Sequence, residues 1–149
     1  MTQIRKALLT DLEPLVKLFD AYRVFYKKES DTEGAQRFLA DRFINGESII
    51  FIAETITNEI VGFVQLYPLF SSTRMKRLWL LNDLYVDPVF RNKKISIALI
   101  DACKKHCLDS DGCGVILETA KSNIIGNQLY PKAKFTLDQE HNYYSWEVE

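Results

Sequence analysis

The hydrophobic positions in the first third of the chain repeat with the period of α-helices. Before them, a short alternating run over residues 4–8 predicts a strand. Residues 10–13 have the Thr-x-x-Glu spacing of a capping box, and the apolar side chains after them recur at helical spacing to about Lys27. A second helical stripe covers residues 38–44 and stops near Gly46. We therefore expect a strand followed by two helices.

The pattern changes to that of strands in the middle of the chain. Residues 49–53 form a continuous β-branched and aromatic run, and a turn over residues 57–59 leads into a returning strand over residues 60–66. Gly62 interrupts that strand and predicts a bulge or the close approach of another segment. Residues 77–86 are apolar again. Three consecutive strands are therefore expected here.

The second half of the chain alternates between helix and strand. A helix is predicted over residues 95–108, a buried strand over residues 115–118, and a short helix from about Asn123. Residues 135–137 and 143–148 are predicted to close the fold as two strands. The complete order, β-α-α-β-β-β-α-β-α-β-β, describes an α/β fold in which helices flank a mixed central sheet.

Size and charge narrow the class of protein. The 149 residues have the length and composition of a single globular domain, expected to span residues 1–149. The net charge of −1 gives no electrostatic reason to expect nucleic acid or an anionic membrane as a partner. No apolar run reaches the length of a membrane span, and the first residues do not read as a secretory signal, so a cytoplasmic location is expected.

The three cysteines, Cys103, Cys107 and Cys113, lie close together in the sequence. Their odd number fits reduced thiols better than a disulfide framework. Cys103 and Cys107 are one helical turn apart with His106 nearby, but no matching pair of ligands occurs elsewhere, so no metal is expected. No base stands at a motif spacing from them either, and a cysteine nucleophile is not expected.

The stretch over residues 81–100 carries the strongest candidate chemistry. It is predicted to be a buried strand, a turn containing proline, a loop with Arg91, Lys93 and Lys94, and a helix. The first N–H groups of a helix lack internal partners, so this arrangement suits an anion. The alternative is an ordinary strand–turn–helix with a solvated basic loop.

Two motifs decide between these alternatives. Residues 86–91 read Val-Asp-Pro-Val-Phe-Arg ahead of the helical residues 97–100, and residues 123–130 read Asn-Ile-Ile-Gly-Asn-Gln-Leu-Tyr ahead of Lys134 and Phe135. With the order of elements, they resemble the GCN5-related N-acetyltransferase superfamily. In that family the first motif continues as an acyl-CoA pyrophosphate loop, Arg/Gln-x-x-Gly-x-Gly/Ala, and the second reads Asn-x-x-Ala-x-x-Leu-Tyr before Gly-Phe.

Three positions depart from the family pattern. Lys94 stands where the loop glycine belongs, Ser96 where a second glycine or alanine belongs, and Lys134 replaces the glycine of the Gly-Phe pair. Glycine reaches positive φ and lets phosphate oxygens approach the backbone. A lysine in that conformation costs about 1 kcal/mol. The Lys94 side chain either obstructs the phosphate or adds an ammonium contact.

The resemblance implies an acyl-CoA-dependent N-acetyltransferase that moves an acetyl group from acetyl-CoA to a primary amine. The resemblance also implies that the transfer is direct, within a ternary complex. Residues 81–86 and 65–68 are similar to the branch of the family that acetylates polyamines and basic protein tails. A small amine or polyamine is therefore expected as the acceptor, and a protein lysine next. A catalytically degenerate binding or regulatory module with the same fold is the alternative.

The same resemblance suggests catalytic roles for two residues. Tyr130 matches the tyrosine that protonates the CoA sulfur, unless it only packs at the end of its helix; Pro131 is expected to bias it away from helical geometry. Asp83 is the candidate general base, and its alternative is a buried structural carboxylate. Asn82 stands where relatives carry a carboxylate and cannot act as a base. Glu118 is a weaker candidate.

Binding residues are inferred in the same way. Those expected to hold acetyl-CoA lie on a strand, the cationic loop and two helix starts: Leu84, Tyr85, Val86, Arg91, Asn92, Lys93, Lys94, Ile95, Ser96 and Asn123. Asn123 is alternatively a helix N-cap. Asn82 is expected to contact the acceptor, and aromatic and acidic side chains are expected to surround a cationic amine: Tyr22, Tyr26, Glu29, Asp31, Tyr67 and Trp79. Relatives often pair through C-terminal strands, which implies a possible homodimer.

Overall fold

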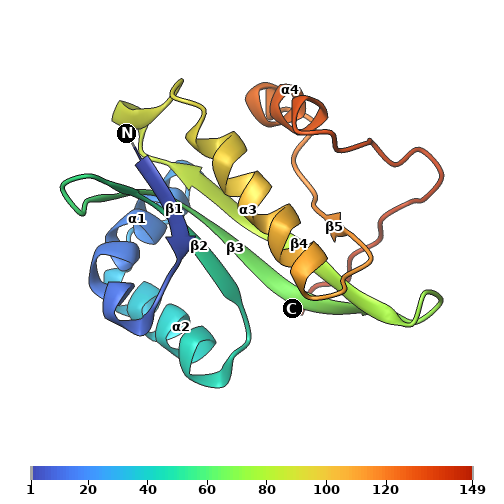
Figure 1. Cartoon of the computed structure of the whole chain (residues 1–149), viewed down its shortest axis with the longest axis horizontal. Coiled ribbons are helices and arrows are strands. Elements are labelled where there is room, and N and C mark those ends of the chain that lie inside the picture. The colour runs from blue at the N-terminus through green and yellow to red at the C-terminus, as the bar shows by residue number, and fades with distance from the viewer. Residues whose placement is uncertain (1, 149) are drawn as a thin grey trace. The chain divides into compact units, whose positions relative to one another are not determined.

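The computed structural model describes residues 2–148 and contains one five-stranded sheet (Figure 1). The strands lie in the order β1-β2-β3-β4-β5, antiparallel except for the parallel pair β4–β5. Their bounds are Thr2–Lys6 for β1, Ile49–Thr55 for β2, Ile60–Ser71 for β3, Lys76–Val86 for β4 and Val115–Ile116 for β5. The mixed α/β fold predicted from the sequence is confirmed.

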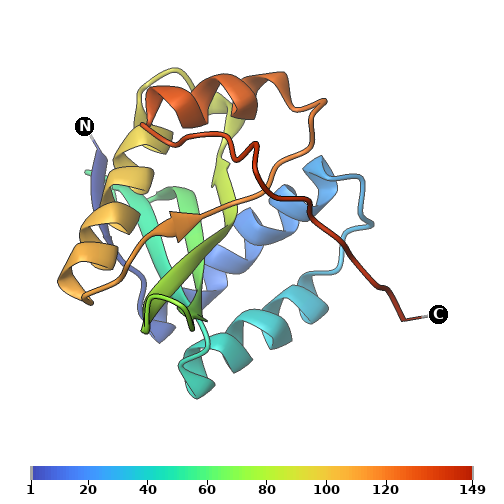
Figure 2. The same ribbon diagram turned by 90° about the vertical axis from the view of Figure 1, so that its right-hand side faces the viewer.

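The four α-helices follow the predicted order. They are α1 (Leu12–Phe25), α2 (Thr32–Asn45), α3 (Ile95–Asp109) and α4 (Ile124–Lys132), with 3-10 turns at Leu9–Asp11 and Pro88–Phe90. By its contacts the chain divides into two compact units, Met1–Glu118 and Thr119–Glu149. Within the first unit, α1 and α2 cover one face of the sheet and α3 the other (Figure 2). None of the helices among residues 2–148 is long and apolar enough to span a membrane.

Strand alternation divides the side chains between these two faces. Ile50 and Ile52 of β2 are buried in the cluster that also holds Phe19 and Leu39 of the two helices. Phe51, between the two isoleucines, points to the other face and contacts the His106 ring of α3. Side chains of successive strand residues point to opposite faces, so the continuous apolar run belongs to a strand buried on both sides.

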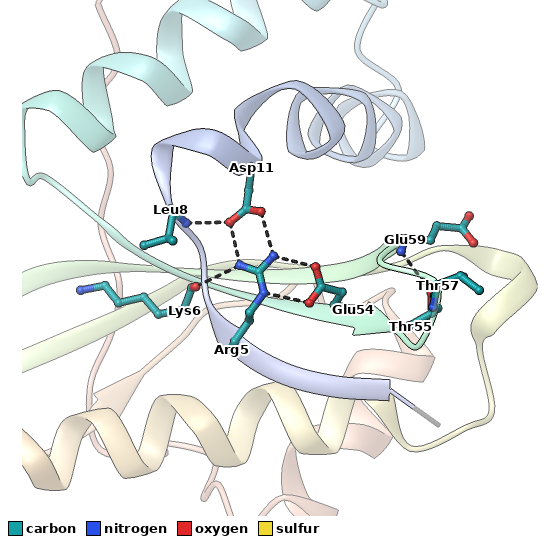
Figure 3. Close-up of polar contacts among 8 residues, drawn as sticks. All are labelled: Arg5, Lys6, Leu8, Asp11, Glu54, Thr55, Thr57 and Glu59. Carbon is teal, nitrogen blue, oxygen red and sulfur yellow. Dashed lines mark hydrogen bonds and ion pairs between the residues drawn. The ribbon is translucent and has the colours of Figure 1, made fainter.

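The start of α1 differs from the predicted capping box. Asp11 makes no cap hydrogen bond with its side chain to the helix, and instead accepts from the Leu8 N–H at 2.8 Å. Its two oxygens also bind Arg5 at 2.7 and 2.8 Å, and Arg5 binds Glu54 of β2 through two further hydrogen bonds (Figure 3). The Asp11 side chain thus caps the 3-10 turn before α1, and its ion pair with Arg5 ties β1, β2 and the start of α1 together.

Gly62 allows two segments to approach β3 closely, as its position in the pattern predicts. A Cβ atom there would lie 3.1 Å from the Tyr85 carbonyl oxygen and 3.4 Å from Cγ2 of Ile95. The register between β2 and β3 also shifts at this point, because Ala53 pairs with Gly62 and Glu54 with Ile60. The glycine thus lets the first residue of α3 pack onto the sheet.

The two predicted C-terminal strands are wrong. Of the described residues, 135–148 take part in no strand pair, and the preceding strand is limited to Val115–Ile116. The alternating apolar residues Tyr144, Trp146 and Val148 are more than 80% exposed. Alternation shows which side chains share a face, but a strand forms only where a neighbouring strand satisfies its backbone.

The expectation that Pro131 keeps Tyr130 out of helical geometry is also wrong, because α4 continues through Pro131 to Lys132. Three backbone hydrogen bonds hold this last turn: Ala133 N–H to Leu129 O, Lys134 N–H to Pro131 O and Phe135 N–H to Tyr130 O, each 2.9 Å long. Tyr130 is therefore helical although it precedes a proline, since the bonds beyond the proline outweigh the local preference.

Candidate active site

One edge of β4 is open where the candidate residues lie. β5 pairs with β4 only at Trp79 and Leu80, so among the described residues no strand covers this edge from Leu81 to Val86. An uncovered edge presents backbone N–H and C=O groups that an extended, amide-containing ligand can bind. The predicted cosubstrate residues Leu84, Tyr85 and Val86 all belong to this segment.

A β-bulge at Asn82 determines which side chains face α1. Gln65 pairs with Asp83 and Leu66 with Leu81, so Asn82 is an extra residue in β4. Beyond the bulge, Asp83 and Tyr85 point toward α1. Before it, Trp79 points toward α3.

Trp79 therefore does not belong to the amine site, contrary to the prediction. Its ring centroid lies 4.7 Å from that of His106, and its Nε1–H donates to Ser110 Oγ at 3.0 Å. Both partners lie at the α3 side of the sheet. Simple alternation along β4 places Trp79 and Asp83 on one face, and the extra residue at Asn82 breaks that alternation.

Asp83 is a buried carboxylate surrounded by hydrogen-bond donors. Its side chain accepts from Gln65 Nε2 at 2.7 Å, from Asn82 Nδ2 at 3.1 Å and from the Tyr22 hydroxyl. Burial raises the pKa of this carboxyl above its usual value, and the hydrogen bonds from Gln65, Tyr22 and Asn82 oppose that rise. A carboxylate with a raised pKa is a stronger base than an exposed one.

Tyrosines surround this carboxylate on the α1 face. The Tyr22 ring lies 5.0 Å from Tyr26 and 6.2 Å from Tyr85, centroid to centroid. Burial, and then the charge of Asp83, raise the pKa of Tyr67 to about 12 and that of Tyr22 still further. Both phenols therefore keep their protons at neutral pH, so the group offers hydroxyl donors and aromatic faces around a single acid.

The loop between β4 and α3 has the features of an anion site. Asn92 and Lys94 adopt left-handed conformations, with φ of 62° and 61°, and α3 begins at Ile95 without a side-chain cap. Within the described part of the chain, the backbone N–H groups of residues 92–97 form no hydrogen bond. Lys94 thus takes the conformation that the family glycine would have. Unpartnered N–H groups at a helix start attract anionic oxygens.

Three exposed cations accompany these N–H groups. Arg91 donates from Nε to the Val86 carbonyl oxygen at 3.0 Å, and its guanidinium lies over the Tyr85 ring at 5.6 Å. Lys93 Nζ lies 4.8 Å from the Phe90 ring centroid. The exposed Lys94 follows, and Ser96 lies within the first turn of α3. The charge and donors together fit a polyanionic group such as a pyrophosphate.

The second unit, considered by itself, contains the other predicted motif. Asn123 Oδ1 accepts from the Gly126 N–H at 3.1 Å, so Asn123 is an N-cap of α4, and its Nδ2 donates to Thr119 Oγ1 at 2.9 Å. The rings of Tyr130 and Phe135 pack edge to face at 5.9 Å. Lys134 has φ of 63°, again the conformation of the glycine that it replaces.

The predicted acidic residues at the α1–α2 connection have structural partners. Asp31 caps α2 by accepting from the Gly34 N–H, and its own N–H donates to Asp20. Asp20 is buried and also accepts from Ser30 Oγ at 2.6 Å, which lowers the pKa of the Asp20 carboxyl. These contacts give Asp31 a structural role in the connection between α1 and α2. Binding of the amine by the Glu29 side chain stays a prediction.

Gln65 is the residue that the sequence did not single out as part of the site. It is fully buried and lies directly opposite Asp83. A polar residue between Val64 and Leu66 in an apolar strand is the signal that marks it. No cluster of three or more potential metal-binding side chains occurs among residues 2–148.

An open strand edge, a buried carboxylate and a helix start with unpartnered N–H groups thus lie along β4 of this mixed α/β fold. A family model described as "Acetyltransferase (GNAT) family" matches residues 15–135. The chain therefore belongs to the acetyltransferase (GNAT) family and is an N-acetyltransferase.

Three relatives illustrate the similarity. YhfO of Bacillus subtilis, described as an uncharacterized N-acetyltransferase, is 39% identical over 145 residues, which is 97% of each chain. A solved probable acetyltransferase is 32% identical, covers 99% of this chain and 98% of its own, and has a TM-score of 0.94. A predicted acetyltransferase from Clostridium acetobutylicum, solved with acetyl-CoA, shares the fold at a TM-score of 0.78 and 19% identity, covering 97% and 96% of the two chains.

Proposed function

We propose that this enzyme transfers the acetyl group of acetyl-CoA directly to a primary amine, without a covalent enzyme intermediate. The observation that carries the proposal is the continuity of β4: its open edge begins beside the buried Asp83 and ends at the anion-binding loop. One strand thus connects a site for an amine with a site for a pyrophosphate.

The loop and the open edge would bind acetyl-CoA, which supplies a thioester activated for attack by an amine. The N–H groups of residues 92–97 and the side chains of Arg91, Lys93 and Lys94 would hold its phosphates. The backbone between Leu84 and Val86 would hold the pantetheine arm and direct an N–H toward the thioester oxygen. Asn123 caps α4, and its contact with the CoA arm stays part of the proposal.

Two side chains would move the protons. Asp83 would take a proton from the attacking amine, directly or through a water molecule, as the new C–N bond forms. Tyr130 would give its phenolic proton to the sulfur as the C–S bond breaks. The amine thus loses one proton and the thiolate gains one, so the reaction balances without a metal or an oxidant. Tyr130 is assigned from its motif, and Asp83 from its motif and its burial.

A small amine or polyamine is the proposed acceptor, and a protein lysine the next choice. The tyrosines around Asp83 supply aromatic faces for an ammonium group, with Tyr26 half-exposed at the rim. Asn82, exposed on the bulge, would contact the acceptor as an uncharged group. The carboxylate attracts the cation, which releases its extra proton to solvent before it attacks; Asp83 then takes the proton that the amine loses as the C–N bond forms.

We further propose that the enzyme acts in the cytoplasm and forms a homodimer. The segment after α4 exposes Leu137, Tyr143, Tyr144, Trp146 and Val148 by 76% or more. An exposed apolar segment with strand alternation suits pairing with a strand of a second copy. A catalytically inactive module is the competing function, and the three departures from the family's glycine pattern, at Lys94, Ser96 and Lys134, are what favours it.

Mass spectrometry of the product tests the function. The protein is incubated with acetyl-CoA and a panel of small primary amines, polyamines and a lysine peptide, and each amine is examined for an added acetyl group. We expect N-acetylation of at least one small amine or polyamine, at a rate that falls roughly a hundredfold or more in Asp83→Asn. Tight binding of acetyl-CoA with no acetylated product from any amine would instead support the inactive module.

A further inference from the structure

Gln65 is a fully buried amide that faces Asp83 across two strands. Its Nε2 lies 2.7 Å from Asp83 Oδ2 and 3.2 Å from the Tyr67 hydroxyl oxygen. The bulge at Asn82 makes Gln65 and Asp83 a direct cross-strand pair, and Tyr67 follows two residues later on the same face of β3. The amide thus has one hydrogen for each of two neighbours.

The carbonyl oxygen of this amide has no hydrogen-bond partner among the described residues. Gln65 Oε1 is buried and accepts no hydrogen bond within the described part of the chain. An unsatisfied buried acceptor costs stability, because the oxygen has lost its hydrogen bond to water and gained none in the protein. A leucine or methionine would fill a similar volume between Val64 and Leu66 without that cost, so the cost calls for a role that an apolar side chain lacks.

We propose that Gln65 is a positioning residue that lets Asp83 alternate between carboxylate and carboxylic acid. With Asp83 ionised, Nε2 donates to it, as observed. When Asp83 holds the amine proton, its O–H needs an acceptor in the same place. Rotation of the amide by half a turn would bring Oε1 there, so one side chain serves both states. This role rests on the proposed function of Asp83 as the base.

Tyr67 would follow the same change. In the observed state its hydroxyl oxygen accepts from Gln65, so its own hydrogen is available for another partner. After rotation of the amide, the hydroxyl would donate to Oε1 instead. While Asp83 is ionised, the Tyr67 hydroxyl could therefore donate its hydrogen bond to another group. Once Asp83 is protonated, the hydroxyl would donate to Gln65 instead, so the Tyr67 hydroxyl and the Gln65 amide would change partners together.

Other ionisable groups lie around Gln65, Asp83 and Tyr67 and affect their pKa values. Tyr22 of α1 donates to Asp83, and its pKa is also raised by Tyr26 and Tyr67. The positive charge of Arg42 on α2 acts on Tyr67 and favours its ionised form. The raised pKa values of Tyr22 and Tyr67 keep both phenols protonated near neutral pH, so Asp83 is the group whose titration Gln65 would control.

NMR titration tests this role without requiring turnover. The carbon-13 signal of the Asp83 carboxyl, assigned by its loss in Asp83→Asn, is followed against pH in the wild type and in Gln65→Met. We expect the Asp83 midpoint to rise by about one pH unit in Gln65→Met, because the hydrogen bond that Gln65 donates to the charged form is stronger than the one that it would accept from the acid, and both are lost. In the wild type, the side-chain amide protons of Gln65 should titrate with the midpoint of Asp83.

Gln3→Met is the matched control, since Gln3 is exposed on the outer strand β1. It should leave the Asp83 midpoint unchanged. Should Gln65→Met not fold, Gln65→Glu keeps the shape and places a second acid beside Asp83, which should raise the midpoint still more. An unchanged midpoint in the folded Gln65 variant, or wild-type Gln65 amide signals that ignore the Asp83 titration, would overturn the proposal. A shifted midpoint with no acetylated amine would instead overturn the proposed function alone.

Discussion

The Arg91 guanidinium donates from Nε to the carbonyl oxygen of Val86, 3.0 Å away. This bond joins the cationic loop to the last residue of the open edge of β4. The first basic side chain of the loop is therefore held where the proposed phosphate site and the strand meet. Arg91 also lies over the rings of Phe25 and Tyr85, which belong to the aromatic side of the site.

Replacing Arg91 tests the phosphate site. We expect Arg91→Met to raise the KM for acetyl-CoA about tenfold, the equivalent of one charge-assisted hydrogen bond, with a smaller effect on kcat. Arg91→Lys keeps the charge and should lose less. Steady-state kinetics measure both, and Arg37→Met, at an exposed position of α2, is the control. An unchanged KM in Arg91→Met would show that this side chain does not contact the cosubstrate.

Removing the Tyr130 hydroxyl tests the proposed acid. Tyr130→Phe keeps the ring that packs on Phe135 but has no proton to give. We expect kcat to fall roughly a hundredfold and the KM for acetyl-CoA to change little, because a proton donor acts in the transition state. Tyr143→Phe, at an exposed position, should behave as the wild type. A Tyr130→Phe enzyme with kcat within a factor of about two of the wild type would assign this tyrosine to packing.

Asp83→Asn tests the base through the pH dependence of both activity and stability. The pKa of Asp83 is raised by burial, so its stabilising contribution is present at low pH and is lost as pH rises through the folded-state pKa. We expect kcat/KM to fall roughly a hundredfold or more and its acidic limb to disappear.

The melting temperature gives the second observable. The Tm of Asp83→Asn relative to the wild type should increase as pH rises through the Asp83 midpoint, because asparagine never carries the buried charge. A difference in Tm that is constant with pH would contradict the raised pKa.

The ion pairs of Arg5 predict the opposite pH dependence. Arg5 lowers the pKa of Asp11 and of Glu54, chiefly through side-chain hydrogen bonds. Their contribution to stability is therefore present above the usual carboxyl pKa values and is lost as pH falls through the lowered ones. Arg5→Met should lower the Tm at neutral pH, and the loss should shrink in acid. Thermal melts from pH 7 to pH 2 measure this, and an equal loss at all pH values would exclude the ion pairs as the cause.

The sequence predicted the elements and the loop more accurately than the distribution of side chains between the faces. Lys94 and Lys134 adopt the left-handed conformation that the family motif reserves for glycine, and Asp83 is buried beside donors. These features follow from local spacing. Trp79 was misplaced because one extra residue at Asn82 reverses the alternation of β4, and no composition signal marks a bulge.

Gln65 was missed for a related reason. Its importance depends on the cross-strand register that places it opposite Asp83, and register is a property of two strands together. The C-terminal strands failed for lack of a partner, since Tyr144 and Trp146 have the alternation of a strand and remain exposed. Residue patterns thus predict local structure, whereas pairing decides what becomes buried.

Initial-rate kinetics with both substrates varied give the most direct test of the central claim. The rate of CoA release is measured at several concentrations of acetyl-CoA and of the amine that becomes acetylated. Direct transfer within a ternary complex predicts double-reciprocal lines that intersect. Parallel lines would show a covalent acetyl-enzyme and contradict the mechanism, and release of CoA at a rate independent of every amine would contradict the function itself.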